Sequence, residues 1–204
     1  MALLIISSNQ DEENLIEVKA ILVGDISVGK TSLINVTAGM RFNPQEKTTI
    51  TSTFIKKIIE IDSKIFQINL WDTAGQEKLK SLTKLFIKGS QIVIFVYDIT
   101  ESNTFENLKK WIKDIEETLD GKYICGIVGN KKDLYIQEKV KEEMAKNFAK
   151  TKGMKFKVVS AKEDPKSFSD FLEELVKDGK DIFPAKNKIS LQKDIKKKKQ
   201  NWKC

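Results

Sequence analysis

The segment from Gly24 to Thr31 constrains the fold of this chain more than any other feature. It reads Gly-Asp-Ile-Ser-Val-Gly-Lys-Thr, fits the pattern G-x-x-x-x-G-K-[ST], and lies between the apolar run Val18–Val23 and a stretch with helical spacing, Thr31–Ala38. About one chain in a hundred of this composition would match the pattern by chance, so the pattern alone is only suggestive. Its position between a strand and a helix makes the assignment much stronger. The pattern predicts a phosphate-binding loop that joins a buried strand to a helix. A glycine-containing turn without a ligand is the alternative.

The residue types in this segment suit phosphate chemistry. Glycines let backbone N–H groups turn inward around phosphate oxygens, and the N-terminus of the following helix adds a favourable dipole. We expect the Lys30 ammonium to bridge the β- and γ-phosphates of a nucleotide. We expect the Thr31 hydroxyl to bind Mg²⁺, a cation that prefers oxygen ligands.

Further apolar runs along the chain predict the other strands of a sheet. Runs typical of buried parallel strands occur at Ile92–Tyr97, Tyr123–Val128 and Phe156–Val159. A partly alternating pair, Phe54–Ile61 and Ile65–Leu70, is joined by the polar Asp62-Ser63-Lys64 and predicts an antiparallel hairpin at one edge.

Stretches with helical spacing separate the parallel strands. Besides the helix after the glycine-rich loop, they are Phe105–Leu119, Gln137–Thr151 and Ser167–Val176. We expect the first of these to turn Trp111, Ile112 and Ile115 toward the core. The alternation predicts an α/β fold: a mostly parallel six-stranded sheet with one antiparallel edge strand and helices on both faces.

The composition limits the class of protein. A chain of 204 residues, 40% of them hydrophobic, suits one globular domain with an appendage. No apolar run approaches the roughly 20 residues that span a bilayer, and Met1–Ile6 lacks the basic flank of a signal peptide, so we expect a cytosolic protein. Cys125 and Cys204 form no disulfide framework or metal cluster, and the absence of histidine excludes histidine-based catalysis.

The net charge of +7 is concentrated at the end of the chain. Residues 186–204 hold eight lysines and one aspartate, so the 185 residues before them have no net formal charge. The globular part therefore lacks the basic excess of a nucleic-acid-binding protein, and we expect no nucleic-acid partner.

A second motif, Asp72-Thr73-Ala74-Gly75-Gln76-Glu77, follows the strand that ends at Trp71. Asp72 emerges at a strand C-terminus, where open α/β sheets bind ligands, and it suits binding of Mg²⁺ through water. Gly75 lets a backbone N–H approach a γ-phosphate, and Gln76 can orient an attacking water. A surface turn is the alternative for this motif taken by itself.

Two further motifs indicate that the base of the nucleotide is guanine. Asn130-Lys131-Lys132-Asp133 follows a strand, and the Asp133 carboxylate can accept hydrogen bonds from the ring N–H and the amine of guanine. Adenine lacks this donor pair, so an ATP-using enzyme is disfavoured. Ser160-Ala161-Lys162 ends the next strand and offers the Ala161 N–H to a guanine carbonyl oxygen. All four motifs follow strands, and we expect them to share one pocket at one rim of the sheet.

In order and spacing, GDISVGKT, DTAGQE, NKKD and SAK resemble the nucleotide-binding boxes of the Ras-superfamily small GTPases. Within that superfamily, the stretch Val96–Glu101 followed by Phe105 and Trp111 is similar to the Rab proteins. The Rab-type I-G-V-D-F segment appears here as Ile50-Thr51-Ser52-Thr53-Phe54, so the chain is identified as a divergent member. The resemblance implies a G domain at 17–182, an N-terminal extension at 1–16 and a flexible lysine-rich tail at 183–204.

The resemblance also implies roles for individual residues. Phe42 takes the place of the aromatic beside guanine, and Thr49 that of the hydroxyl that binds Mg²⁺ with Thr31. Gln76, Lys30 and Thr49 are the expected catalytic residues. The expected GTP-binding set is Asp25, Ile26, Ser27, Val28, Gly29, Lys30, Thr31, Ser32, Phe42, Thr49, Gly75, Asn130, Lys131, Asp133, Ser160, Ala161 and Lys162.

The expected function is a switch that cycles between GTP and GDP and regulates vesicle traffic. Its implied partners are an exchange factor, a GTPase-activating protein and effectors at the switch regions Arg41–Thr53 and Gly75–Gly89. The single arginine, Arg41, lies on the guanine side of its loop, so we expect hydrolysis without an activating protein at well below roughly one turnover per minute.

Ile26 and the altered Thr51–Thr53 keep a second function open. A small residue is usual at the position of Ile26, and a branched side chain there would crowd the γ-phosphate. We expect it to hinder Gln76 or an incoming arginine; a side chain that points away is the alternative. A poorly hydrolysing, nucleotide-retaining interaction scaffold is therefore the alternative function.

The tail predicts a membrane contact. Lys196–Lys199 beside Cys204 resemble a lipid-modified Rab tail, in which one lipid chain and a basic patch together give stable anchoring. We expect prenylation of Cys204 and a peripheral position on the cytosolic face of a membrane. A solvating tail without modification is the alternative, since the chain ends in a lone cysteine rather than a C-a-a-X box or the usual pair.

Overall fold

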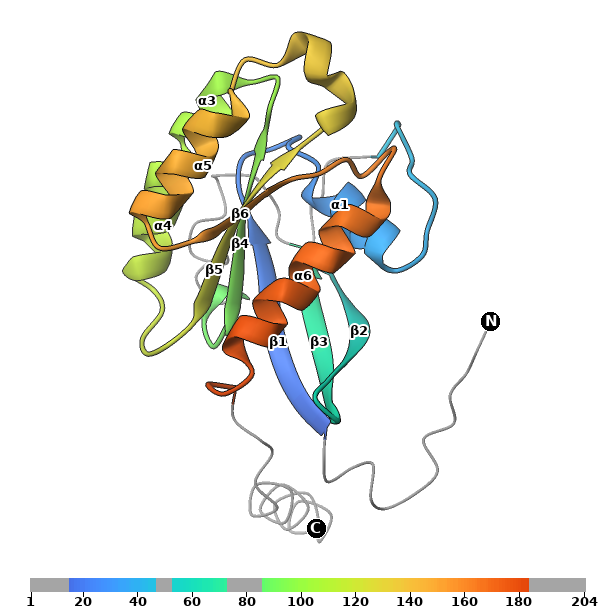
Figure 1. Ribbon diagram of the computed structural model, residues 1–204, viewed down its shortest axis with the longest axis vertical. Coiled ribbons are helices and arrows are strands. Elements are labelled where there is room, and N and C mark those ends of the chain that lie inside the picture. Colours follow the sequence, from blue (N-terminus) through green and yellow to red (C-terminus); the bar gives the residue numbers. More distant parts are fainter. Residues whose placement is uncertain (1–14, 47–52, 73–85, 184–204) are drawn as a thin grey trace, which may run out of the picture.

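A six-stranded sheet forms the centre of the molecule (Figure 1). The computed structural model describes residues 15–46, 53–72 and 86–183. The strands follow the order β2-β3-β1-β4-β5-β6, and within these residues only β2 pairs with its neighbour in antiparallel fashion. Their bounds are β1 (Leu15–Val23), β2 (Thr53–Ile61), β3 (Lys64–Asp72), β4 (Ile92–Asp98), β5 (Ile124–Asn130) and β6 (Lys155–Val158). The predicted fold class is confirmed.

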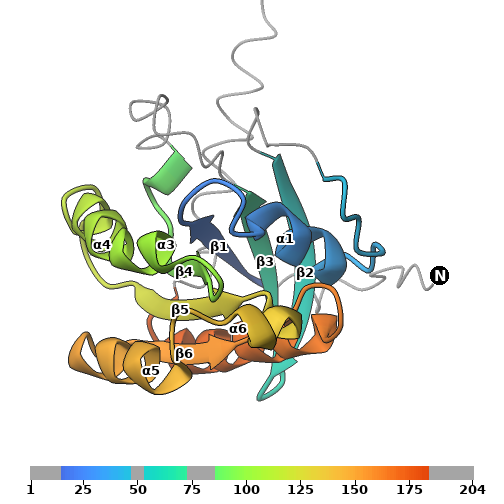
Figure 2. The same cartoon turned by 90° about the horizontal axis from the view of Figure 1, so that it is seen from above.

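Helices cover both faces of the sheet (Figures 1 and 2). One face carries α1 (Lys30–Thr37) and α6 (Pro165–Gly179); the other carries α3 (Ser102–Glu106), α4 (Leu108–Glu116) and α5 (Glu142–Thr151). Two apolar clusters lie beneath these layers. Along β1, Ala20 and Leu22 enter the α1–α6 cluster, whereas Ile21 and Val23 enter the other. Burial on both faces explains why the central strands read as unbroken apolar runs.

The β2–β3 hairpin turns at two residues with left-handed backbone. Asp62 and Ser63 have φ values of 51° and 61°. Positive φ at both central residues matches the twist of a two-residue hairpin, and aspartate adopts that conformation more readily than most residues. The hairpin predicted around these polar residues is therefore present.

The helix predicted at Phe105–Leu119 is broken once. Asn107 separates α3 from α4, although its backbone keeps helical angles (φ −67°, ψ −14°). Ile112 and Ile115 are buried as expected, and Trp111 packs partly against the same cluster.

The prediction of a helix at Gln137–Thr151 places its start too early. Residues Lys132–Gln137 form the 3₁₀ helix η2, and α5 begins only at Glu142. The N–H groups of Lys139 and Val140 instead donate to the carbonyl oxygen of Ile99, at 2.9 and 3.1 Å. These two bonds hold the segment against the end of β4 and keep it out of the helix.

Among the described residues, none of the helices combines the length and apolar character that crossing a bilayer requires.

Candidate nucleotide-binding site

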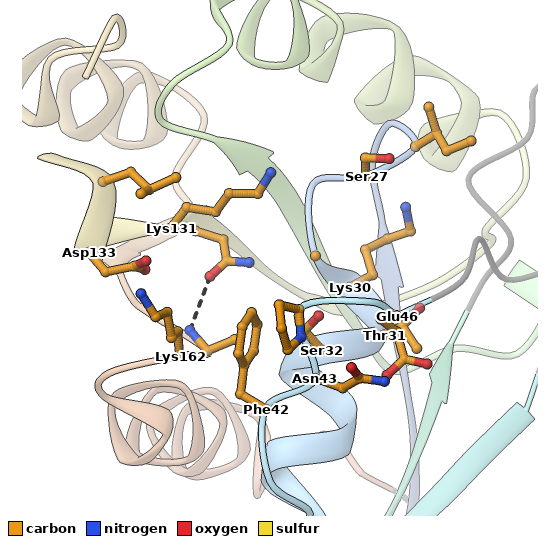
Figure 3. A pocket seen from close by; sticks show the side chains of 16 residues that line it. Ser27, Lys30, Thr31, Ser32, Phe42, Asn43, Glu46, Lys131, Asp133 and Lys162 are labelled. Atoms are coloured by element: carbon orange, nitrogen blue, oxygen red, sulfur yellow. Dashed lines mark hydrogen bonds between the residues drawn. The ribbon is translucent and has the colours of Figure 1, made fainter. Parts of the chain in front are cut away.

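A pocket of about 490 Å³ opens near the carboxyl ends of β1, β4 and β5. Its lining comes from the β1–α1 loop, the first turn of α1, the segment after α1, the end of β5 with the residues that follow it, and the segment after β6. In Figure 3, Ser27, Lys30 and Thr31 lie toward one end, and Lys131, Asp133 and Lys162 lie toward the other. Three of the predicted motifs thus contribute to one cavity.

Two glycines shape the β1–α1 loop. Gly24 has a φ of 149°, and a Cβ there would lie 2.1 Å from the carbonyl oxygen of Val96 on β4. Gly29 has a φ of 94°, and its Cβ would lie 2.3 Å from Nδ2 of Asn130 on β5. Both the close approach of backbone and the left-handed conformation require residues without a side chain.

The Lys30 ammonium is buried beneath this loop, with the residue 5% exposed. It donates hydrogen bonds to the carbonyl oxygens of Gly24, at 2.8 Å, and Asp25, at 2.7 Å. Burial lowers the pKa of Lys30 from 10.5 to about 8, although the carboxylates of Asp72 and Asp25 act to raise it. A cation held here, beside the N-terminus of α1, is suited to bind phosphate.

Thr31 and Asp72 form the part of the site that suits a metal. The Thr31 hydroxyl donates to Oδ2 of Asp72 at 2.8 Å, and Asp72 is 1% exposed at the end of β3. A hydroxyl and a carboxylate are oxygen donors of the kind that Mg²⁺ takes beside nucleotide phosphates. The donor types of Thr31 and Asp72 therefore fit Mg²⁺.

Asn130 joins the end of the pocket that holds Lys30 to the end that holds Asp133. Its side chain donates from Nδ2 to the carbonyl oxygen of Val28 at 2.9 Å and accepts at Oδ1 from the Ala161 N–H at 3.3 Å. The residue is 2% exposed. One buried amide thus fixes the β1–α1 loop against the segment that follows β6.

The carboxylate of Asp133 is held by a hydrogen bond at the end of the pocket opposite Lys30. Its Oδ1 accepts from the Ser160 hydroxyl at 2.6 Å. Lys131 has left-handed backbone (φ 69°), and its ammonium forms an ion pair of 2.5 Å with Oδ2 of the buried Asp98. Asp98 also accepts from the backbone N–H and hydroxyl of Thr100.

The sequence-predicted residues divide into three groups. Those that line the pocket are Ile26, Ser27, Gly29, Lys30, Thr31, Ser32, Phe42, Asn130, Lys131, Asp133, Ala161 and Lys162. Asp25, Val28, Asp72 and Ser160 lie behind the lining and bond to residues that form it. Thr49, Gly75, Gln76 and Cys204 lie outside the described residues.

Sequence reasoning missed Asp98, Asn107 and Trp111. Asp98 could have been found, because it ends β4 at the same rim as the predicted motifs. Asn107 and Trp111 hydrogen-bond to Asp25 across 82 and 86 residues, and nothing in their local sequence indicates those contacts.

Comparison with known proteins identifies the family. Residues 19–180 match the sequence model of the Ras family. The chain belongs to the Ras family. It is 36% identical to the Ras-related protein YPTC6 of Chlamydomonas reinhardtii over 77% of this chain and 74% of that protein. It is also 36% identical to the Ras-related protein Rab11B of Nicotiana tabacum, over 78% of this chain and 75% of that protein. The Ras-related protein Rab-21 of Geodia cydonium is 38% identical over 72% and 65%.

Membership of the Ras family, with Rab relatives, makes this protein a Rab-like GTPase switch. Proteins of this family bind GTP and GDP with Mg²⁺ and act through exchange factors, activating proteins and effectors. The resemblance predicted from the four motifs is therefore confirmed at the level of the family.

Proposed function

We propose that this protein is a slowly hydrolysing GTP switch of vesicle traffic. The observation that carries the proposal is a single pocket with the buried Lys30 ammonium at one end and the fixed Asp133 carboxylate at the other. A phosphate-binding cation and a guanine-reading carboxylate in one cavity suit a guanine nucleotide. The Rab relatives support a role in traffic.

In this proposal the residues of the pocket mainly position and neutralise the nucleotide. Lys30 and the loop N–H groups hold the phosphates, Phe42 packs beside the base, and Asn130 and Asp133 hold guanine. Thr31 and Thr49 would hold Mg²⁺, which would supply positive charge to offset that of the phosphate oxygens. Gln76 orients the attacking water, and the Gly75 N–H senses the γ-phosphate.

Slow hydrolysis is proposed because no arginine of this chain is suited to act on the phosphates. Arg41 is the sole arginine of the sequence, and its side chain is exposed and does not belong to the described lining of the pocket. Charge stabilisation by an arginine contributes roughly 10³–10⁵ in rate, so an activating protein must supply it.

The nucleotide-retaining scaffold is favoured by one observation. Ile26 lines the pocket and is 47% exposed, and in this proposal its branched side chain hinders an activating arginine or Gln76. In this second candidate the protein keeps GTP bound and presents one partner surface for long periods.

Identification of the bound nucleotide and a single-turnover measurement test both candidates. The full-length protein is purified, its nucleotide is released and identified, and [γ-³²P]GTP is then followed for several hours with Lys30→Ala as the non-binding control. Guanine nucleotide with measurable hydrolysis below roughly one turnover per minute supports the switch. Hydrolysis that stays at the control level supports the scaffold, and adenine nucleotide or none contradicts both.

We further propose that the chain is a G domain at 17–182 with an N-terminal extension at 1–16 and a lysine-rich tail at 183–204. In this proposal Cys204 is prenylated and, with Lys196–Lys199, holds the protein on the cytosolic face of a membrane. The intact mass of the protein from its native cells tests the modification. An unmodified C-terminus would remove the lipid anchor from the proposal.

A further inference from the structure

A hydrogen-bond network lies behind the β1–α1 loop, which is called the phosphate loop below. The residues of this network do not belong to the described lining of the pocket. Both carboxylate oxygens of Asp25 accept hydrogen bonds from the α3–α4 segment. Asn107 donates from Nδ2 to Oδ2 at 2.7 Å, and Trp111 donates from Nε1 to Oδ1 at 2.8 Å. The two donors are four residues apart, so they project from the same side of the helical segment. Figure 2 shows α3 and α4 beside the loop that joins β1 and α1.

The Asp25 main chain bonds to a group that contacts the nucleotide in the proposed function. Its carbonyl oxygen accepts from the Lys30 ammonium at 2.7 Å. Asp25 therefore connects α4, through its side chain, to the phosphate-binding lysine, through its backbone. The next residues are Ile26, which lines the pocket, and Ser27, whose φ of 63° is uncommon for a residue with a side chain. A loop with such backbone needs external contacts that hold its shape.

The position of Asn107 in the fold indicates that its contact with Asp25 is more than incidental. Asparagine directly before a helix ordinarily accepts a hydrogen bond from the first turn of that helix. Asn107 takes this position before α4 and makes no such cap. Its amide instead donates to Asp25, 82 residues earlier in the chain. Packing of α4 on the sheet is supplied by other side chains, Leu108, Ile112 and Ile115.

We propose that Asn107 and Trp111 are positioning residues for the guanine nucleotide. Through Asp25 they hold the phosphate loop in the shape that places Lys30 and Ile26 at the phosphates, so nucleotide retention depends on α4. The proposal rests on guanine-nucleotide binding as proposed above. Hydrogen bonds to a charged carboxylate stabilise more than neutral ones, so loss of one donor should loosen the loop measurably.

The test compares release of a fluorescent GDP analogue from the full-length protein and three variants. Asn107→Ala removes one donor, and Trp111→Phe removes the other while keeping an aromatic ring. Asn103→Ala, at an exposed asparagine of α3, is the matched control. We expect roughly 3- to 10-fold faster release from Asn107→Ala and from Trp111→Phe, and no change from the control. This range corresponds to the loss of part of the free energy of one hydrogen bond to a charged group.

Repetition in an Asp25→Ala background separates positioning from general stability. If the effect passes through Asp25, Asn107→Ala adds nothing to the release rate of Asp25→Ala. Melting temperatures are measured in parallel, because a merely structural role lowers them without changing release. In the ¹H–¹⁵N spectrum the Trp111 indole N–H signal should shift in Asp25→Ala even without nucleotide.

Three results would overturn the inference. They are unchanged release from both donor variants, equal acceleration with and without Asp25, and an indole signal that does not respond to Asp25→Ala. If the wild-type protein does not bind the analogue at all, the proposed function fails first. The indole spectrum still reports the Asp25–Trp111 contact in that case, so the two failures are distinguishable.

Discussion

The Thr31 hydroxyl donates a 2.8 Å hydrogen bond to Oδ2 of Asp72, joining the start of α1 to the end of β3. The bond spans 41 residues of sequence, and its two partners are the oxygen donors that we assign to Mg²⁺. The sheet order places β1 and β3 side by side, which brings the phosphate loop and the carboxylate together. The proposed metal-binding part of the site thus results directly from the strand order.

Thr31→Val should remove most of the dependence of nucleotide retention on Mg²⁺. Valine keeps the branched shape of threonine but has no oxygen to bind the cation, whereas Thr31→Ser keeps the hydroxyl and is the matched control. We expect GDP release in Mg²⁺ to be roughly tenfold faster in Thr31→Val, which corresponds to one charge-assisted interaction. Release rates are measured with Mg²⁺ and with EDTA. An equal response of Thr31→Val and wild type to EDTA would contradict the assignment.

Asp133→Asn should weaken GTP binding strongly. The Asp133 carboxylate can accept two hydrogen bonds from guanine, and an amide turns one of these acceptors into a donor. We expect the affinity to fall by roughly 10²–10³, the effect of two hydrogen bonds to a charged group. Glu163→Gln, an acid-to-amide change at an exposed site nearby, is the control. Titration calorimetry with GTP and ATP is the measurement, and unchanged GTP affinity would remove Asp133 from base recognition.

Nucleotide affinity should fall as pH rises above 8. Burial lowers the pKa of Lys30 to about 8 in the nucleotide-free protein, and bound phosphate favours the charged ammonium and raises that pKa. The free protein therefore loses a proton above pH 8 that the complex keeps. Linkage gives roughly fourfold weaker binding at pH 8.5 than at pH 7.

Calorimetry in two buffers of different ionisation enthalpy checks the pH prediction, because binding at pH 8.5 should take up most of one proton. Lys162→Ala removes another lysine of the pocket and should keep the pH dependence. Proton release on binding, or an affinity that is constant from pH 7 to 8.5, would show that Lys30 is not the titrating group.

The strands were predictable because their apolar runs reflect burial on both faces. Val93 and Phe95 enter one cluster and Ile94 enters the other, so both faces of β4 are buried and the strand is apolar until it reaches the rim of the sheet at Asp98. The start of α5 was not predictable, because it depends on two N–H groups that bond to Ile99, about 40 residues earlier in the chain. Periodicity reports which face of an element is buried, and it carries no information on such distant backbone pairing.

The lining of the pocket was predictable for a different reason. Lys30 and Asp133 belong to motifs that follow strands, and parallel strands bring such ends to one rim. The contacts of Asp25 with Asn107 and Trp111 join the β1–α1 loop to the α3–α4 segment. They depend on how close the loop lies to this segment, and no sequence motif specifies that distance. Sequence reasoning therefore found most of the residues that line the pocket, and it missed Asn107 and Trp111, which support the loop from the helical segment beside it.

Ile26→Gly should raise hydrolysis stimulated by a GTPase-activating protein. Ile26 is 47% exposed and lines the pocket beside Ser27, so removing its side chain opens space for an arginine from an activating protein. We expect at least roughly a tenfold gain, a small part of the 10³–10⁵ that such an arginine contributes. Ile26→Ala should give an intermediate gain.

Ile136→Gly, at an isoleucine that is 84% exposed on η2, is the control. The assay follows phosphate release from GTP-loaded protein with activating protein from the same cells. Equal stimulated rates in wild type and Ile26→Gly would show that Ile26 does not limit hydrolysis and would remove the main support for the scaffold.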